Sequence, residues 1–160
     1  MRTVTIKERS KIDDVIRRCK TCFVASSVDN IPYVLPMTFA IAGDTVILHS
    51  GQSGRMWETL HKNPKVCINW TYGGELAWQD VRVGCSYRVK SVSVVVEGTV
   101  EFIDSYSEKE QCLKLLMACY SERQFRFNSP AVKNVGIMKV HIDQISAKEF
   151  GASSLTSPQK

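Results

Sequence analysis

The chain has 160 residues, 44% apolar and 23% charged, with a net charge of +5 at pH 7. This composition predicts one globular domain over 1–150, followed by a flexible tail over 151–160. No apolar run is long enough for a transmembrane helix, and the N-terminus lacks the apolar core of a secretory signal. We therefore expect a cytoplasmic protein without a membrane role, whose six cysteines stay reduced.

The first third of the chain predicts one helix and two strands. Apolar residues recur at helical spacing over 10–19, which begins with the serine of a capping-box pattern. Residues 22–28 read as a strand, and the side chains of 32–41 alternate between two faces, with Leu35, Met37, Phe39 and Ile41 on one of them. Two prolines in this second strand remove ladder donors. Part of one edge is therefore expected to be free for a ligand or a partner.

The middle third continues with a strand over 45–50 and a short helix that ends before Pro64. A strand is predicted over 65–72. Residues 73–86 show no helix or strand periodicity and are predicted to form a loop. A loop of this length is often functional or part of an interface.

The last third predicts the remaining strands. Residues 91–102 alternate most clearly, and Ser107 opens a second capping-box pattern before an apolar helix. A final strand covers 135–146, with Met138 and Val140 facing inward. Six mostly antiparallel strands with flanking helices favour a small barrel, and an open α+β sheet is the competing geometry.

Cysteines and histidines give weak signals of chemistry. Cys19 and Cys22 form a C-x-x-C, but it ends a helix, whereas a redox motif begins one. We interpret them as small apolar residues, and we predict no metal site because no second cysteine pair or histidine spacing completes one. His61 and His141 occupy surface positions. For His49, which ends a strand beside a glycine-rich turn, a structural role and a ligand role stay open.

The basic residues near the N-terminus are typical of a solvated helix face. Residues 1–20 contain seven lysines and arginines against three acidic residues. No aromatic residues lie between these charges to stack on bases, so we expect no nucleic-acid partner.

The turn "HSGQSGR" (49–55) is the strongest functional feature. It leads from a strand into a helix N-terminus, where free N–H groups and the helix dipole attract a phosphate. Gly51 and Gly54 allow the backbone to approach closely, and Arg55 can add a bidentate cation. The spacing matches neither GxxxxGK[ST] nor GxGxxG. A polar turn with an exposed arginine is the alternative.

Several motifs around this turn occur in a characteristic order. From Pro32 onward the chain shows P-Y-x-x-P, a strand ending in H-S, then G-R, N-P-x-V, and a cysteine shortly before S-V. This ordered set, over about 10–150, resembles the FMN-binding split-barrel superfamily that includes pyridoxamine 5'-phosphate oxidase. The nearest group is the nitroimidazole-resistance, nitroreductase-like proteins. The resemblance implies a six-stranded antiparallel split β-barrel.

The resemblance also implies a homodimer with two flavins, usually FMN and in some relatives FAD, each in a cleft between the subunits. It assigns the isoalloxazine to the backbone of 36–38, the ribityl chain to 49–51 and the phosphate to 54–56. The implied flavin-binding residues are Pro36, Met37, Thr38, His49, Ser50, Gly51, Ser53, Gly54, Arg55 and Met56.

Two departures from the family pattern affect the expected activity. Many relatives carry a lysine at the position of Met56, so one phosphate cation is missing. The R-L-x-P and W-x-x-Q-G segments that bind the substrate of the vitamin B6 oxidases do not occur, which argues against vitamin B6 oxidation.

The resulting hypothesis is a flavin-dependent oxidoreductase that reduces small electron-poor acceptors such as nitroimidazoles or nitroaromatics. His49 is the predicted catalytic residue, which orients the acceptor or supplies a proton. The electrons would come from NAD(P)H or a separate reductase. The alternative is a non-catalytic carrier of flavin, haem or pyridoxal phosphate, because a fold does not determine a function.

Overall fold

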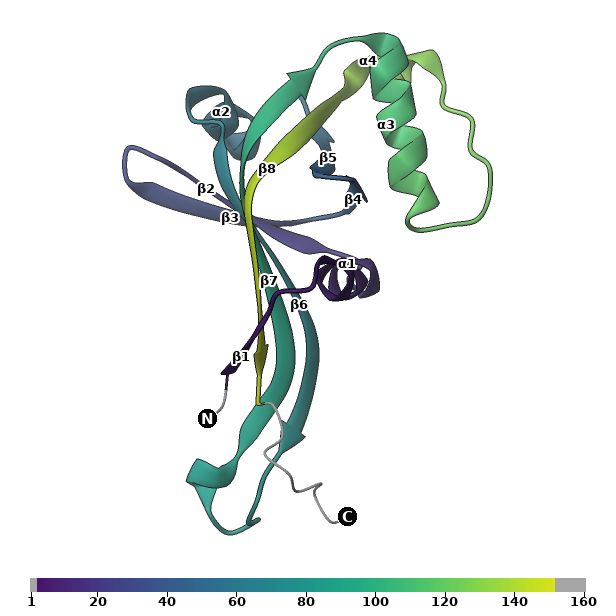
Figure 1. The fold of residues 1–160 in the computed structure, drawn as a ribbon. Helices are drawn as coiled ribbons and strands as arrows, with labels where there is room; N and C mark the ends of the chain where they lie inside the picture. Colours follow the sequence, from purple (N-terminus) through teal and green to yellow (C-terminus); the bar gives the residue numbers. More distant parts are fainter. Residues whose placement is uncertain (1–2, 152–160) are drawn as a thin grey trace. The chain divides into compact units, whose positions relative to one another are not determined.

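The structure is a computed structural model that describes residues 3–151 of the chain. Within this range there are eight strands and four α-helices (Figure 1). In chain order they are β1 (Thr3–Ile6), α1 (Arg9–Arg18), β2 (Cys22–Val28), β3 (Ile31–Met37), β4 (Phe39–Ala42), β5 (Thr45–Gly51), α2 (Arg55–Lys62), β6 (Lys65–Ala77), the 3-10 turn η1 (Gly84–Ser86), β7 (Arg88–Ile103), α3 (Tyr106–Ala118), α4 (Ser129–Asn134) and β8 (Val135–Phe150). No helix among these is long and apolar enough to cross a membrane.

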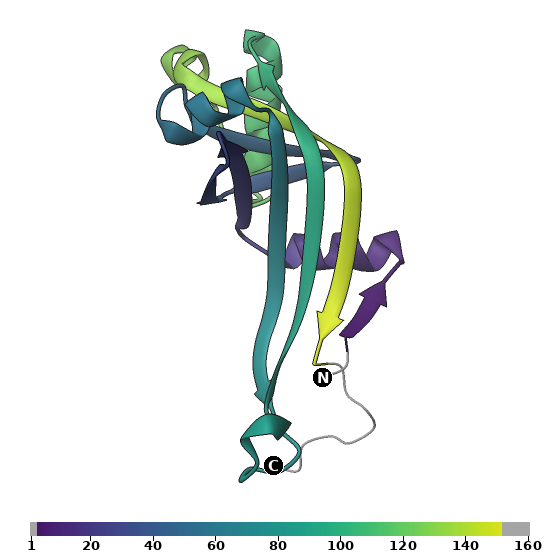
Figure 2. The same ribbon diagram turned by 90° about the vertical axis from the view of Figure 1, so that its left-hand side faces the viewer.

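The strands form one sheet in the order β3-β2-β6-β7-β8-β5-β4, and β1 pairs with β8. The long strands β6, β7 and β8 lie side by side (Figure 2). The mainly-β class with flanking helices is confirmed, but the count of six strands is too low. The structure adds β1. It also divides the predicted strand over 32–41 into β3 and β4, because the strand is interrupted at Thr38.

The described residues form two compact units. The first contains those up to Cys19, Asn69–Val95 and those from Ile145 on; the second contains Lys20–Ile68 and Val96–Gln144. No finding tests the prediction of a single domain, and the predicted tail lies outside the described residues except for Gly151.

In the first unit, β1 pairs antiparallel with the end of β8, from Thr3 opposite Phe150 to Ile6 opposite Ala147. Here the loop predicted from residue 73 begins too early, since β6 continues to Ala77. Gly73 has φ = 108°, and a Cβ there would lie 2.7 Å from the Lys90 carbonyl oxygen. A glycine that reads as a turn therefore lets the strand continue against β7.

Both predicted capping boxes are wrong. Helix α1 begins at Arg9 with Glu8 as its N-cap, and α3 begins at Tyr106 with Ser105 as its N-cap. Neither N-cap side chain bonds to the helix backbone. Ser10 and Ser107 lie inside the first turns, because a Ser-x-x-acid spacing alone does not fix where a helix starts.

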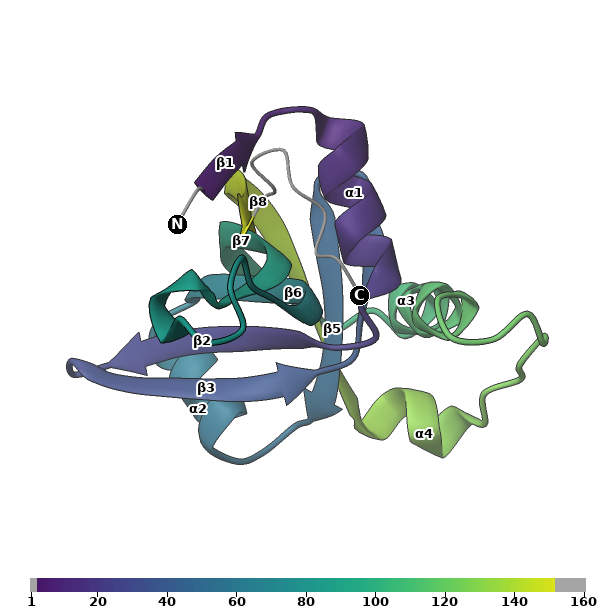
Figure 3. The same ribbon diagram turned by 90° about the horizontal axis from the view of Figure 1, so that it is seen from below.

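The second unit contains the β2–β3 hairpin, whose strands lie side by side in Figure 3 and pair from Cys22 opposite Met37 to Val28 opposite Ile31. Strand β5 pairs antiparallel with both β4 and β8. Helix α3 buries Cys112 and Leu116 in a core cluster with Ala40, Ile47, Ile103 and Ile137.

Helix α2 is held in this unit by an aromatic cluster. The ring centroids of Trp57 and Phe102 lie 4.7 Å apart, and the His61 ring stacks on Phe102 at 3.9 Å. The Trp57 ring also lies against Gly136, the β8 residue paired with Ser50. These contacts pack α2 against β7 and β8 and so position the turn that precedes the helix.

We expect Gly136→Ala to lower the free energy of unfolding by about 1–3 kcal/mol, the usual cost of overpacking. A Cβ at this position would lie 2.3 Å from the Trp57 ring. Thermal denaturation should show a lower Tm, which Gly136→Ala/Trp57→Leu partly restores. Gly84→Ala is the control, since nothing lies within 4 Å of its Cβ position. An unchanged Tm for Gly136→Ala would contradict this packing.

Candidate functional site

The connection between β5 and α2 is open at the helix N-terminus. Strand β5 ends at Gly51, and Gly54 is the N-cap of α2 with φ = 95°, a conformation that favours glycine. A Cβ on either glycine would have nothing within 4 Å. The first N–H groups of α2 therefore face accessible space, which suits an anion of phosphate size.

Arg55, the first residue of α2, carries the positive charge of this turn. Its guanidinium carbon lies 4.3 Å from the centroid of the Tyr33 ring on β3. No carboxylate within residues 3–151 pairs with Arg55. The aromatic ring orients the guanidinium by a cation–π contact, and the charge stays available for an external anion.

Three of the predicted segments come together in the second unit. The β4–β5 ladder ends with the pair Phe39–Leu48, so Thr38 and His49 are the first residues beyond this end of the ladder. The contact of Arg55 with Tyr33 places β3 beside the start of α2. The strand break at 38, the end of β5 and the turn thus border one site.

The predicted flavin-binding residues differ in what they expose. Ser50 is half-buried and donates its hydroxyl to the Gly51 carbonyl. Met37 and Met56 are buried, and the Met56 sulfur accepts a hydrogen bond from Ser26 at 3.7 Å. Met56 can therefore contribute only its backbone to an anion. The exposed members are Pro36, Thr38, His49, Gly51, Ser53, Gly54 and Arg55.

The three histidines have different surroundings. His61 bonds through Nδ1 to the Trp57 carbonyl at 2.8 Å, and His141 pairs with Glu101 at the surface. His49 is exposed, yet partial burial of its ring lowers the pKa of the imidazole. Since the lowered pKa favours the uncharged form, His49 is neutral at pH 7 and can both donate and accept a hydrogen bond.

Tyr120 fixes the strand break beside the site. Its hydroxyl accepts a hydrogen bond from the Phe39 N–H at 2.8 Å, and lies within donating distance of the carbonyls of Lys20 and Phe39, at 2.9 and 3.1 Å. Burial raises the pKa of this phenol, which keeps the proton in place. The sequence marks Tyr120 as part of an apolar helix face and gives no signal of this contact with β4.

Gln52 anchors the turn to the start of β8. Its side-chain amide donates to the carbonyls of Lys133 and Val135, each at 2.9 Å. The sequence places Gln52 inside the turn but does not reveal these partners, which lie more than 80 residues away. The turn is therefore fixed at both ends, by Gln52 at β8 and by Arg55 at β3.

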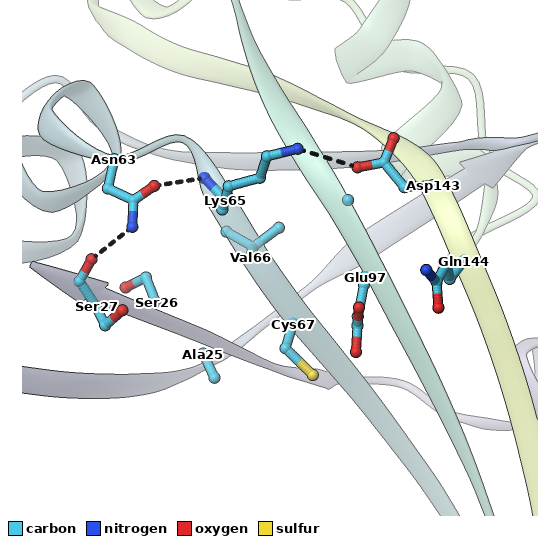
Figure 4. Close-up of a pocket in the computed structure, with 11 residues that line it drawn as sticks. Ala25, Ser26, Ser27, Asn63, Lys65, Val66, Cys67, Glu97, Asp143 and Gln144 are labelled. Atoms are coloured by element: carbon cyan, nitrogen blue, oxygen red, sulfur yellow. Dashed lines mark hydrogen bonds and ion pairs between the residues drawn. The ribbon is translucent and has the colours of Figure 1, made fainter. Parts of the chain in front are cut away.

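A cavity of about 600 Å³ lies elsewhere in the second unit, between β2, β6, β7 and β8 (Figure 4). Its lysine, Lys65, donates to Thr99 and pairs with Asp143 at 3.4 Å, so this charge is already compensated. None of the predicted flavin residues lines the cavity. The cavity therefore offers an anion no free cation.

The cysteines do not form a redox or metal site. The Cys19 thiol lies within donating distance of the carbonyls of Val15 and Thr71, and Cys22 donates to the carbonyl of Met37. None of the six cysteines forms a disulfide within residues 3–151, and burial raises the pKa of Cys19. Within residues 3–151 no group of three histidine, cysteine or acidic residues is placed to hold a metal ion.

Comparison with protein families matches residues 9–149 to the pyridoxamine 5'-phosphate oxidase family. The chain belongs to this family. Its solved relatives include a candidate 5-nitroimidazole antibiotic resistance protein from Bacteroides thetaiotaomicron, with 38% sequence identity and a TM-score of 0.84. The alignment covers 93% of this chain and 88% of that protein. A comparison with curated proteins found no match.

Two more distant members of this structural group share the fold. The FAD and haem binding protein from Mycobacterium smegmatis has a TM-score of 0.84 and 17% identity, over 96% of this chain and 76% of that one. The flavocytochrome Anf3 from Azotobacter vinelandii has a TM-score of 0.81 and 18% identity, over 96% and 72%. The family assignment confirms the split-barrel fold.

Proposed function

We propose that this chain binds FMN at the turn over 49–56 and uses it to reduce small electron-poor acceptors, in particular 5-nitroimidazoles. The observation that carries the proposal is the uncompensated charge of Arg55, held by Tyr33 at an open helix N-terminus. The 38% identical relative, a candidate 5-nitroimidazole resistance protein, supports this substrate class. The same site would take the phosphate end of FAD.

The chain's residues bind and orient, and bound flavin supplies the hydride or electron transfer. Arg55 and the first N–H groups of α2 bind the phosphate. Thr38, in the strand break fixed by Tyr120, borders the ring system. His49 lies just beyond the same end of the β4–β5 ladder as Thr38. Its neutral imidazole can orient a nitro oxygen, and its imidazolium, which forms at lower pH, can pass that oxygen a proton. Electrons would come from NAD(P)H or from a separate reductase.

The experiment begins with the visible spectrum and the Kd for FMN and FAD of the purified protein. The FMN complex is then reduced by dithionite under argon and mixed with a 5-nitroimidazole, and reoxidation is compared with that of free reduced FMN. Faster reoxidation on the protein supports the proposal. In parallel, NADH and NADPH are tested as donors. Failure to bind FMN or FAD would contradict the proposal.

A carrier function is the second candidate. Two proteins that share the fold are described by the groups they carry: one is an FAD and haem binding protein, and the other is a flavocytochrome. In addition, His49 has no hydrogen-bonded acid or base among the described residues. Tight FMN binding with reoxidation no faster than that of free reduced FMN would favour the carrier, and a Soret band would favour haem.

We expect a homodimer, because one sheet face exposes apolar side chains. Phe23, Val34 and Pro36 share a face of the β2–β3 hairpin, since Ala25 pairs with Val34 and Phe23 with Pro36. Phe23 and Val34 are 47% and 58% exposed. A stable dimer would cover this face and bury on the order of 2,000 Å² in total.

Light scattering at micromolar concentration should give twice the chain mass. Val34→Lys should shift the mass toward one chain. The control is Leu115→Lys, at another exposed apolar position, on α3. A monomeric parent would refute the dimer.

A further inference from the structure

Lys109, in the first turns of α3, is a buried lysine without a counter-ion. Its exposed fraction is 6%. Its ammonium donates to the Val135 carbonyl at 2.9 Å, and no carboxylate in the part of the chain that the structure describes pairs with it. The neighbouring Glu108 instead pairs with Lys139. A buried ammonium with one neutral acceptor is costly for the fold, so packing alone does not account for it.

The position of Lys109 relates it to the turn. The Val135 carbonyl that accepts from Lys109 also accepts from Gln52, at 2.9 Å in both cases. The Lys109 nitrogen and the Gln52 amide nitrogen are therefore no more than about 6 Å apart. Val135 is also the ladder partner of Gly51. Lys109 therefore contacts the same β8 residue as Gly51 and Gln52, the residues that begin the turn.

We propose that Lys109 is the second cation of the phosphate turn and acts from the side of the Val135 carbonyl, which it shares with Gln52. This inference rests on the proposed function. A phosphate monoester carries up to two negative charges near neutral pH, and Arg55 supplies one positive charge. The ammonium of Lys109, on a side chain that is only 6% exposed, supplies the other, because charges interact more strongly where water is excluded. The phosphate in turn compensates the buried ammonium.

Lys109 acts at a distance, as a positioning and electrostatic residue. The hydrogen bond that Lys109 donates to the Val135 carbonyl holds in place the oxygen that also accepts from the Gln52 amide. Removing the charge should therefore weaken binding of the phosphate and have little effect on binding of the flavin ring. A purely structural Lys109 would affect both equally.

The test compares FMN with riboflavin, which lacks the phosphate. Lys109→Met removes the charge, and Lys109→Gln removes it while keeping a donor for the Val135 carbonyl. Kd values are measured by quenching of flavin fluorescence at low and high salt, and the Tm of the flavin-free protein is recorded. The control is Lys114→Met, an exposed lysine of the same helix that pairs with Glu110.

We expect both Lys109 variants to bind FMN about tenfold more weakly than the parent at low salt, with riboflavin changed less than twofold. The Tm of flavin-free Lys109→Met should be equal to or above that of the parent, because the variant no longer buries an ammonium. Lys114→Met should match the parent. Equal losses for FMN and riboflavin, or none, would overturn the role of Lys109 while parental FMN binding still supports the flavin site. A parent that does not bind FMN overturns both.

Discussion

His49→Ala is expected to lower the rate of nitroimidazole reduction by about 10²–10⁴-fold if His49 is the proton donor, and by less if it only orients the acceptor. FMN affinity should stay nearly intact, because His49 lies on β5 next to the last β4–β5 ladder pair, Phe39–Leu48, and not among the proposed phosphate-binding groups. The measurement uses protein-bound FMN that is prereduced with dithionite. This step bypasses the unidentified electron donor.

The matched control is His141→Ala. His141 is also exposed and lies on the neighbouring strand β8, but it pairs with Glu101. We expect its removal to leave both FMN affinity and reoxidation unchanged. Equal reoxidation rates for His49→Ala and the parent would make His49 structural.

The pH profile gives an independent readout of His49. Burial lowers the pKa of its imidazole below the usual value of about 6.5. The imidazolium therefore forms only as the pH falls through this lowered pKa. If His49 donates the proton, the parental rate should rise as the pH falls through that value, and the rise should be absent in His49→Ala. The same shift makes His49 favour the folded state at neutral pH and oppose it in acid.

The elements whose structure depends on residues close together in the sequence could be predicted from it. Local strand patterns located β2 and β5, the inward-facing and outward-facing residues of 135–146 located most of β8, and the proline at 64 marked the end of α2. The turn over 49–55 was recognisable because its glycines, arginine and helix start follow each other in the chain. Errors occurred where local signals were ambiguous. Gly73 resembled a turn residue but permits a close approach of β6 and β7.

The contacts that orient the turn could not be predicted from the sequence. Arg55 contacts Tyr33, which lies 22 positions earlier in the chain, and Lys109 contacts Val135, which lies 26 positions later. Nothing in the pattern of α3 distinguishes Lys109 from an exposed lysine, because helix periodicity does not report a buried ammonium. At Met56, the family resemblance indicated the loss of a phosphate-binding lysine. The structure shows why this position does not carry a cation: the Met56 side chain packs into the core against Ser26.

Arg55→Ala is expected to weaken FMN binding by about 1.5–3 kcal/mol, the usual contribution of a hydrogen bond to a charged group. This corresponds to a Kd raised by about ten- to more than a hundred-fold. Riboflavin binding should change little, because the guanidinium has no partner other than the Tyr33 ring among the described residues. The measurement is flavin fluorescence titration of both ligands.

Two further variants separate the charge of Arg55 from its orientation. Arg55→Lys keeps a cation but loses the planar, bidentate fork, so it should recover part of the affinity. Tyr33→Leu removes the ring that orients the guanidinium but leaves the charge, and should cost about 0.5–1 kcal/mol, the scale of an exposed cation–π contact. The control is Arg17→Ala, in α1 of the other unit, where Arg17 pairs with Asp14. If Arg55→Ala retains FMN with the affinity of the parent, the turn does not bind the phosphate, and the flavin must be sought at another site of the chain.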